Sequence, residues 1–222
     1  MTTAQLSLEH LIRPSNITQG KAPVLFLFHG YGSNEEDLFS FAEELPGSYC
    51  VIAARAPHTL QPFGYAWYAI NFEATKGKWS DHEQAKASRE LIVRFMEEAC
   101  ETYHLDDKNV NLLGFSQGTV LSYAVALSYP EKIRNVVALS GYIDESVLAE
   151  GYEQKDHSQL NLYVSHGQMD MVIPPEWAQK SSELLDTMGI THTYEEFPVG
   201  HGVSPANFKS FSKWLDEHTK TT

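Results

Sequence analysis

Short apolar runs alternate along the chain with longer amphipathic stretches. Residues 24–28 (Val-Leu-Phe-Leu-Phe) form an uninterrupted apolar run, which is typical of a strand buried on both faces of a sheet. The same pattern predicts strands at residues 49–53, 110–113, 136–139, 160–164 and 191–197. Helices are predicted between them, at residues 35–45, from 80 or 81 to about 103, 119–128, 175–188 and 205–218. Asn34 is expected to cap the first of these helices, and Gly189 to end the fourth.

This alternation predicts an α/β fold. Right-handed crossovers between successive strands give a mostly parallel central sheet with helices on both faces. Residues 6–12 are expected to add an antiparallel strand at one edge. Two long segments, 55–79 and 141–158, are expected to be irregular, and loops of that length in a compact domain are often functional. No repeat, low-complexity tract or linker interrupts the pattern. Residues 1–222 are therefore expected to form a single domain without a large lid domain.

The net charge of the chain argues against two classes of binding partner, nucleic acids and anionic membrane surfaces. The chain has 222 residues, with 16 Lys and Arg against 29 Asp and Glu, for a net charge of −13. Binding to nucleic acid or to anionic membrane surfaces usually needs a basic face, so neither is expected. The two cysteines, Cys50 and Cys100, lie in apolar stretches and are expected to be buried hydrophobic residues. Neither a signal peptide nor an apolar stretch of about 18 residues is found, which argues against stable membrane insertion and favours a cytoplasmic location.

One motif stands where a predicted strand meets a predicted helix. Residues 114–118 (Gly-Phe-Ser-Gln-Gly) fit G-x-S-x-G, and this strand–turn–helix setting is typical of a nucleophile elbow. In such an elbow Ser116 occupies a strained turn, and side chains two residues to either side would collide, so Gly114 and Gly118 fit. The following helix directs free N–H groups at developing negative charge. The alternative is a serine in an ordinary tight turn.

A serine hydroxyl needs an adjacent base, and the base needs an acid to orient it. His201 is the predicted base, because it lies in a glycine-flanked loop just after the predicted strand 191–197. Asp170 is the predicted acid, in the loop that follows strand 160–164, and Asp144 is the rival candidate. The order Ser116, Asp170, His201 along the chain is that of α/β-hydrolases.

The fourth part of the predicted site is an oxyanion hole. Residues 28–33 (Phe-His-Gly-Tyr-Gly-Ser) follow the first buried strand, and glycines there allow the backbone to approach a substrate closely. The backbone N–H groups of Tyr31 and of Gln117, next to the nucleophile, are the predicted donors. The alternative is a glycine turn that only connects a strand to a helix.

Together these segments resemble the phospholipase/carboxylesterase family of α/β-hydrolases, which includes acyl-protein thioesterases. The resemblance is carried by residues 29–32, 55–57, 65–68, 114–118, 166–174 and 200–202, and it spans nearly the whole chain. It implies an α/β-hydrolase fold and a metal-independent serine hydrolase without cofactor, with Ser116, Asp170 and His201 as triad and Tyr31 and Gln117 as oxyanion donors. Thr119 and residues 33–37 depart from the pattern of the acyl-protein thioesterases. These departures indicate a greater similarity to the small bacterial esterases of the family.

Aromatic residues concentrate in segment 55–79, which follows the carboxyl end of a strand, where α/β folds bind ligands. Their rings are expected to line a pocket for an apolar acyl or aryl group; the alternative is that they pack the loop onto the domain. These predicted substrate-binding residues are Phe63, Tyr65, Trp67, Tyr68 and Phe72.

The resulting hypothesis is a serine carboxylesterase acting on small-molecule esters of short to medium chain length. Within the same fold, an acyl-protein thioesterase or lysophospholipase is the main alternative. A non-catalytic binding module and a metal enzyme built on His29 and His166 are the alternatives from other classes. A homodimer that buries exposed aromatic side chains is also compatible with the sequence.

Overall fold

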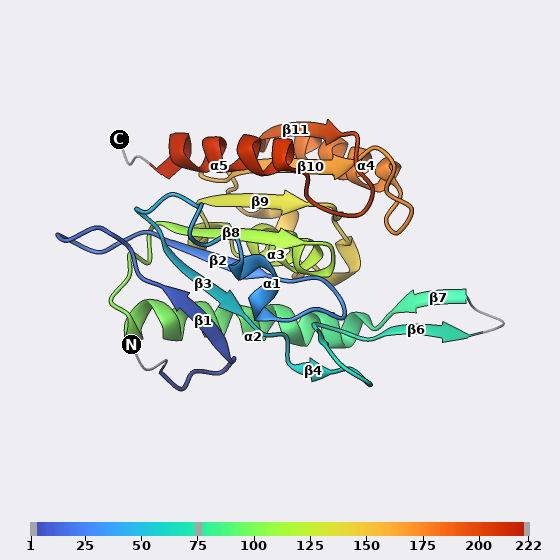
Figure 1. Ribbon diagram of the computed structural model, residues 1–222. Helices are drawn as coiled ribbons and strands as arrows, with labels where there is room; N and C mark the ends of the chain where they lie inside the picture. Colours follow the sequence, from blue (N-terminus) through green and yellow to red (C-terminus); the bar gives the residue numbers. More distant parts are fainter. Residues whose placement is uncertain (1–3, 74–76, 220–222) are drawn as a thin grey trace.

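A computed structural model describes residues 4–73 and 77–219, apart from the side chains of residues 72–79. Within this part of the chain, the largest sheet has seven strands in the order β1-β3-β2-β8-β9-β10-β11 (Figure 1). The strands are β1 (His10–Arg13), β2 (Val24–Phe28), β3 (Cys50–Ala54), β8 (Val110–Phe115), β9 (Asn135–Leu139), β10 (Asn161–Gly167) and β11 (Thr191–Phe197). All neighbours pair in parallel except β1, which runs antiparallel to β3 at the edge.

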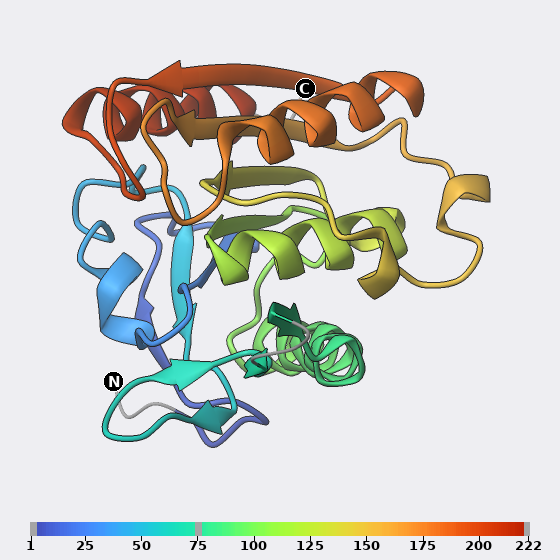
Figure 2. The ribbon, with the colours of Figure 1, turned by 90° about the vertical axis from the view of Figure 1, so that its right-hand side faces the viewer.

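Helices cover both faces of this sheet. Figure 2 shows α1 and α5 on one side and α2, α3 and α4 on the other. The helices are α1 (Glu35–Phe39), α2 (His82–Thr102), α3 (Gln117–Ser128), α4 (Pro175–Thr187) and α5 (Pro205–Thr219). The mostly parallel sheet and its two helical layers confirm the predicted α/β class.

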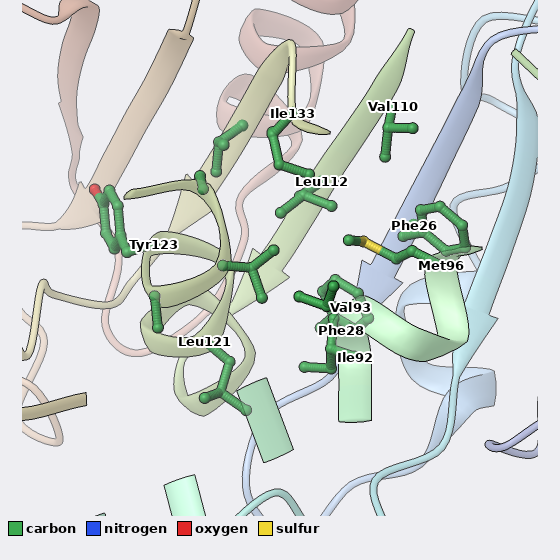
Figure 3. Packing of buried hydrophobic residues seen from close by; sticks show 14 of the residues in the cluster. Phe26, Phe28, Ile92, Val93, Met96, Val110, Leu112, Leu121, Tyr123 and Ile133 are labelled. Atoms are coloured by element: carbon green, nitrogen blue, oxygen red, sulfur yellow. The ribbon is translucent and has the colours of Figure 1, made fainter. Parts of the chain in front are cut away.

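The two faces explain why β2 is apolar throughout. Phe26 and Phe28 pack with Ile92, Met96 and Leu121 on the side of α2 and α3 (Figure 3). Leu25 and Leu27 belong to the opposite cluster, which includes residues from α1 and α5. A strand buried on both faces must be apolar at every position, because alternate side chains enter different cores.

Two helix ends lie where the sequence predicted them, and each is explained by a capping residue. Asn34 Oδ1 accepts the Glu36 N–H at 2.9 Å, which caps α1, and Gly189 after α4 adopts φ 68°. The first helix is shorter than the predicted 35–45. Ser40 Oγ donates to the Asp37 carbonyl at 2.6 Å, a local bond that competes with helix continuation, and the chain proceeds to Leu45 in turns.

The two segments expected to be irregular contain short elements. Between β3 and α2, β4 (His58–Thr59) pairs with β5 (Tyr65–Ala66), and β6 (Ile70–Glu73) pairs with β7 (Gly77–Ser80). After β9 the chain forms the 3-10 helices η2 (Glu145–Val147) and η3 (Tyr152–Gln154); a third, η1 (Pro130–Lys132), follows α3. The β6–β7 ribbon projects on the side to which β8 and β9 point (Figure 1). The segment after β3 and the beginning of the segment after β9 therefore stand at the carboxyl edge of the sheet, where loops assemble a site.

Candidate active site

A sharp turn joins β8 to α3 and carries Ser116. Ser116 adopts φ 54° and ψ −116°, a strained conformation for a residue other than glycine. Its N–H donates to the Leu139 carbonyl at 3.0 Å, and its carbonyl accepts the N–H groups of Thr119 and Val120 at 3.0 and 3.2 Å. These backbone bonds hold the strained turn, so the Ser116 side chain stands at the first turn of α3.

The two glycines of the motif are required by close packing. A Cβ atom on Gly118 would lie 1.9 Å from the Phe28 carbonyl oxygen, and one on Gly114 would lie 2.5 Å from the Gly118 carbonyl oxygen. Both distances are far below van der Waals contact. The collision expected from the sequence on either side of Ser116 is thus present in the fold, and it brings the end of β2 against the start of α3.

His201 and Asp170 converge on Ser116 from the loops after β11 and β10. His201 Nε2 lies 3.0 Å from Ser116 Oγ, and His201 Nδ1 lies 2.7 Å from Asp170 Oδ2. A carboxylate only accepts hydrogen bonds, so the ring proton sits on Nδ1, and Nε2 is left to accept from the serine hydroxyl. The structure therefore brings together the three side chains that the sequence selected, from three separate loops.

The Asp170 carboxylate is buried and held by backbone donors. Its Oδ1 accepts the N–H groups of Val172 and Ile173 at 2.8 and 2.9 Å, and these bonds stabilise the negative charge. The rival acid, Asp144, is engaged elsewhere: its Oδ1 accepts the Ser146 N–H at 3.1 Å as the cap of η2. His201 is therefore paired with Asp170 rather than with Asp144.

The two predicted oxyanion donors flank the serine. In the described part of the chain, neither the Tyr31 nor the Gln117 backbone N–H donates to a protein acceptor. Gly30 sits directly beside the nucleophile, since a Cβ there would lie 3.3 Å from the Ser116 Cβ. Gly32 adopts φ 82°, a value that favours glycine. The loop after β2 thus passes close to Ser116, with N–H groups that remain free to bind a ligand.

Buried hydrogen bonds tie this loop to the segment after β3. Trp67 Nε1 donates to the His29 carbonyl at 2.9 Å, and the Ala56 N–H donates to His29 Nε2 at 3.1 Å. Burial lowers the pKa of His29, in keeping with a neutral ring that accepts at Nε2. The Gln117 side chain accepts the Trp67 N–H and donates to the Tyr68 carbonyl, both at 2.8 Å. Gln117 therefore links the nucleophile turn to the aromatic segment through its side chain.

Ser116 and His201 open into a cavity of about 680 Å³, within the range of small-molecule sites. One part of its wall is apolar and comes from the loop before α4 and the start of that helix. Another part is polar and comes from the segment after β9 and the start of α2. The lining comprises Tyr31, Tyr68, Ile70, Ser80, His82, Ser116, Gln117, Val120, Tyr142, Asp144, Val172, Ile173, Pro174, Trp177 and His201.

The structure separates the five aromatic residues that were predicted to bind substrate. Of these, Tyr68 lines the cavity. Trp67 is fully buried beneath the site, Tyr65 is half-buried with Arg55 4.8 Å above its ring, and Phe63 is 80% exposed outside the cavity. These three are corrected to packing or surface positions, because Trp67 packs on Phe28 and His29, Tyr65 lies against Arg55, and Phe63 faces solvent. The side chain of Phe72 lies outside the described part of the chain.

Sequence reasoning missed much of the cavity wall. Tyr142 packs edge-to-face on Trp177, with ring centroids 4.7 Å apart, and His82 Nε2 lies 3.4 Å from Asp144 Oδ2. Burial, followed by the nearby charge of Asp144, raises the pKa of Tyr142 to about 12. The available signal was the position of segment 141–158 after the carboxyl end of a strand, the same argument that singled out segment 55–79.

A metal site has no support in the part of the chain that the structure describes. Among those residues, no three His, Cys, Asp or Glu side chains are grouped so that they could hold a metal ion. His29 and His166, the residues of the metal-enzyme alternative, are both buried and bonded to backbone carbonyl groups. In the same part of the chain, no helix combines the length and apolar character needed to cross a membrane.

Known proteins resemble the chain over nearly its full length. The acyl-protein thioesterase 1 homolog 1 of Dictyostelium discoideum is 26% identical over 90% of this chain and 92% of its own. Acyl-protein thioesterase 1 of Candida albicans is 25% identical over 95% and 97%. Among solved structures, esterase PE8 superposes with a TM-score of 0.80 at 24% identity, covering 97% of this chain and 100% of that one. The carboxylesterase of Bacillus cereus also gives 0.80, at 19% identity over 95% and 94%.

These structural matches establish the α/β-hydrolase fold. The family model described as Phospholipase/Carboxylesterase matches residues 15–219. That range includes the turn at Ser116 and the loops that carry Asp170 and His201. The chain therefore belongs to the phospholipase/carboxylesterase family.

Proposed function

We propose that this protein is a serine carboxylesterase that hydrolyses short- to medium-chain esters through an acyl-enzyme. The observation that carries the proposal is the position of His201, 3.0 Å from Ser116 Oγ and 2.7 Å from Asp170 Oδ2, at the wall of a cavity. A hydroxyl, a base that can accept its proton and a carboxylate that orients the base are the parts that acyl transfer requires.

The first step forms the acyl-enzyme. His201 Nε2 takes the hydroxyl proton as Ser116 Oγ attacks the ester carbonyl carbon. The carbonyl oxygen gains negative charge, which the free N–H groups of Tyr31 and Gln117 would bind. His201 then gives its proton to the leaving alcohol as the carbon–oxygen bond breaks, which leaves the acyl group on Ser116.

The second step releases the acid. His201 takes a proton from water as the water oxygen attacks the acyl carbonyl carbon. It returns the proton to Ser116 Oγ as the bond between Oγ and the acyl carbon breaks, and the acid leaves. Asp170 stabilises the imidazolium that forms in each step and keeps the proton of the resting ring on Nδ1. Every residue thus returns to its starting protonation state after each turnover.

The cavity supports small esters as substrates. Its volume of about 680 Å³ suits a ligand of modest size, and Ile173, Pro174 and Trp177 offer apolar surface to an acyl chain.

Thioester hydrolysis is the second candidate, favoured by the names of the relatives. The Dictyostelium and Candida proteins, each matched over more than nine-tenths of its own length, are named as acyl-protein thioesterases. Thioesters pass through the same acyl-enzyme, so the site chemistry serves both. Values of kcat/KM for butyrate esters and thioesters with matched leaving groups distinguish the two, and a faster ester supports the first candidate.

The decisive experiment compares wild type with Ser116→Ala on p-nitrophenyl butyrate. We expect kcat to fall by about 10⁴- to 10⁶-fold, as when serine-hydrolase triads are dismantled. A fluorophosphonate probe should label the wild type and leave Ser116→Ala unlabelled. Equal turnover by the two proteins, with both folded by circular dichroism, would refute the role of Ser116. A wild type that neither hydrolyses nor reacts with the probe would point to a binding module.

A further inference from the structure

A buried histidine ring lies against the carboxylate that orients the base. His166, near the end of β10, places its Nε2 3.3 Å from Asp170 Oδ2 and 2.9 Å from the Ile173 carbonyl oxygen. Both side chains of this contact are fully buried. Asp170 Oδ2 is therefore contacted by His201 on one side and by His166 on the other.

The protonation of His166 follows from its partners. The Ile173 carbonyl only accepts, so Nε2 carries a proton and donates to it, while Asp170 Oδ2 lies in contact with the ring at 3.3 Å without accepting that proton. His166 Nδ1 is buried and has no hydrogen-bond partner among the described residues. A second proton on Nδ1 would create a buried and unpaired charged donor, which is costly. The neutral Nε2–H ring fits this environment, and it leaves the charge of Asp170 available to His201.

The same ring also fixes the loop that positions Asp170. Ile173 donates its N–H to Asp170 Oδ1 at 2.9 Å while its carbonyl accepts from His166. Ile173 and the neighbouring Pro174 line the cavity beside Ser116. One imidazole thus braces both the orienting carboxylate and the backbone that carries the apolar wall.

We propose that His166 is a positioning residue, which holds the Asp170 carboxylate toward His201 without contributing charge. This inference rests on the proposed serine-esterase function. His166 does not itself line the cavity and has no hydrogen bond to Ser116, so its effect on catalysis must pass through Asp170 and the loop that it braces.

The test replaces the ring with side chains that keep or lose the donor. His166→Gln retains an amide N–H at the reach of Nε2, whereas His166→Leu fills the space without a donor. With p-nitrophenyl butyrate, we expect His166→Leu to lower kcat by about 10- to 100-fold, by analogy with the loss when outer partners that orient metal ligands are removed. KM should change less than kcat, because the Ile173 N–H still bonds to Asp170 Oδ1 and holds the loop, and Gln should restore most of kcat.

The pH profile separates positioning from general damage. A loosened Asp170 stabilises the His201 imidazolium less, so the acidic limb of the kcat profile should move to lower pH in His166→Leu and stay in place in His166→Gln. His157→Leu is the matched control, because His157 is also buried but bonds to the Leu127 carbonyl near the end of α3 remote from Ser116. It should lower Tm without moving the limb.

The outcomes that overturn the inference are specific. The inference is wrong if His166→Gln and His166→Leu lose kcat equally. It is also wrong if His166→Leu loses kcat while the acidic limb of its pH profile stays in place, or if His157→Leu shows the same losses. If His166→Leu does not fold, His166→Asn takes its place, since its amide is too short to reach the Ile173 carbonyl; Asn matching Gln would then refute the inference. If wild type fails the Ser116 test, the proposed function falls as well. If it passes while His166→Leu matches wild type, only the role of His166 falls.

Discussion

The turn around Ser116 and the segment between β3 and α2 meet at the same cavity, but they are built in different ways. The turn spans five residues, and its tight geometry follows from contacts within it, such as the approach of Gly114 to the Gly118 carbonyl oxygen. The aromatic segment spans more than 20 residues, and its placement depends on distant partners. Trp67, for example, is hydrogen-bonded to His29 and to Gln117, which lie 38 and 50 residues away in the sequence.

This difference determines how much of the structure of each region can be predicted from its sequence. Local sterics leave few residue types acceptable in the turn, so a short motif indicates both its shape and its chemistry. In the aromatic segment many arrangements satisfy the same composition, and tertiary contacts select among them. Tyr68 faces the cavity while the adjacent Trp67 is fully buried, a distinction that composition does not contain.

The largest expected effect tests whether Asp170, rather than Asp144, is the acid that orients His201. Asp170→Asn should lower kcat on p-nitrophenyl butyrate by about 10⁴-fold, because an amide favours the wrong tautomer of His201 and cannot stabilise its charge. Asp144→Asn is the comparison, since Asp144 was the rival acid and lies in the cavity wall. It should cost at most about tenfold, chiefly in KM. Equal losses would show that the two acids had been assigned the wrong roles.

A second prediction tests the steric origin of the turn. Gly118→Ala should lower the free energy of unfolding by about 3 kcal/mol or more, because its Cβ would meet the backbone of Phe28 and neither strand nor helix can move freely. Gly202→Ala is the matched control, with no atom within 4 Å of its Cβ, and should stay within about 0.5 kcal/mol. Urea denaturation measures both, and similar values for the two variants would refute the packing argument.

The sequence predicted most of the scaffold because the determinants are short in range. The apolar run of β2, the Asn34 cap and Gly189 each act within a few residues, and the structure has the strand, the helix start and the helix end at those places. The order of serine, acid and base was informative for a different reason. Parallel strands end at one edge of the sheet, so the loops after β8, β10 and β11 converge without any contact needing to be foreseen.

The rest of the site depends on side-chain directions set by tertiary packing. Residues after the carboxyl end of β9 were recognised as a long segment, yet nothing local predicts that Tyr142 would pack on Trp177 from α4. His166 shows the same limit. It was visible in a motif next to Asp170, but its bond to the Ile173 carbonyl requires the fold of the loop between them.

The smallest expected effects lie in the aromatic segment and contrast two of its rings. Trp67→Phe keeps most of the buried apolar surface but removes the N–H that donates to the His29 carbonyl at 2.9 Å. It should lower the free energy of unfolding by about 1–3 kcal/mol, because a buried carbonyl loses its donor. It should also lower kcat modestly, since His29 precedes the loop that carries the Tyr31 N–H.

Phe63→Ala, at a ring that is 80% exposed, should change the free energy of unfolding by less than about 0.5 kcal/mol and leave kcat/KM within about twofold. Denaturation and p-nitrophenyl butyrate kinetics on the same preparations distinguish the two rings. A large KM increase in Phe63→Ala would restore Phe63 as a substrate contact and show that the ribbon rearranges when substrate binds.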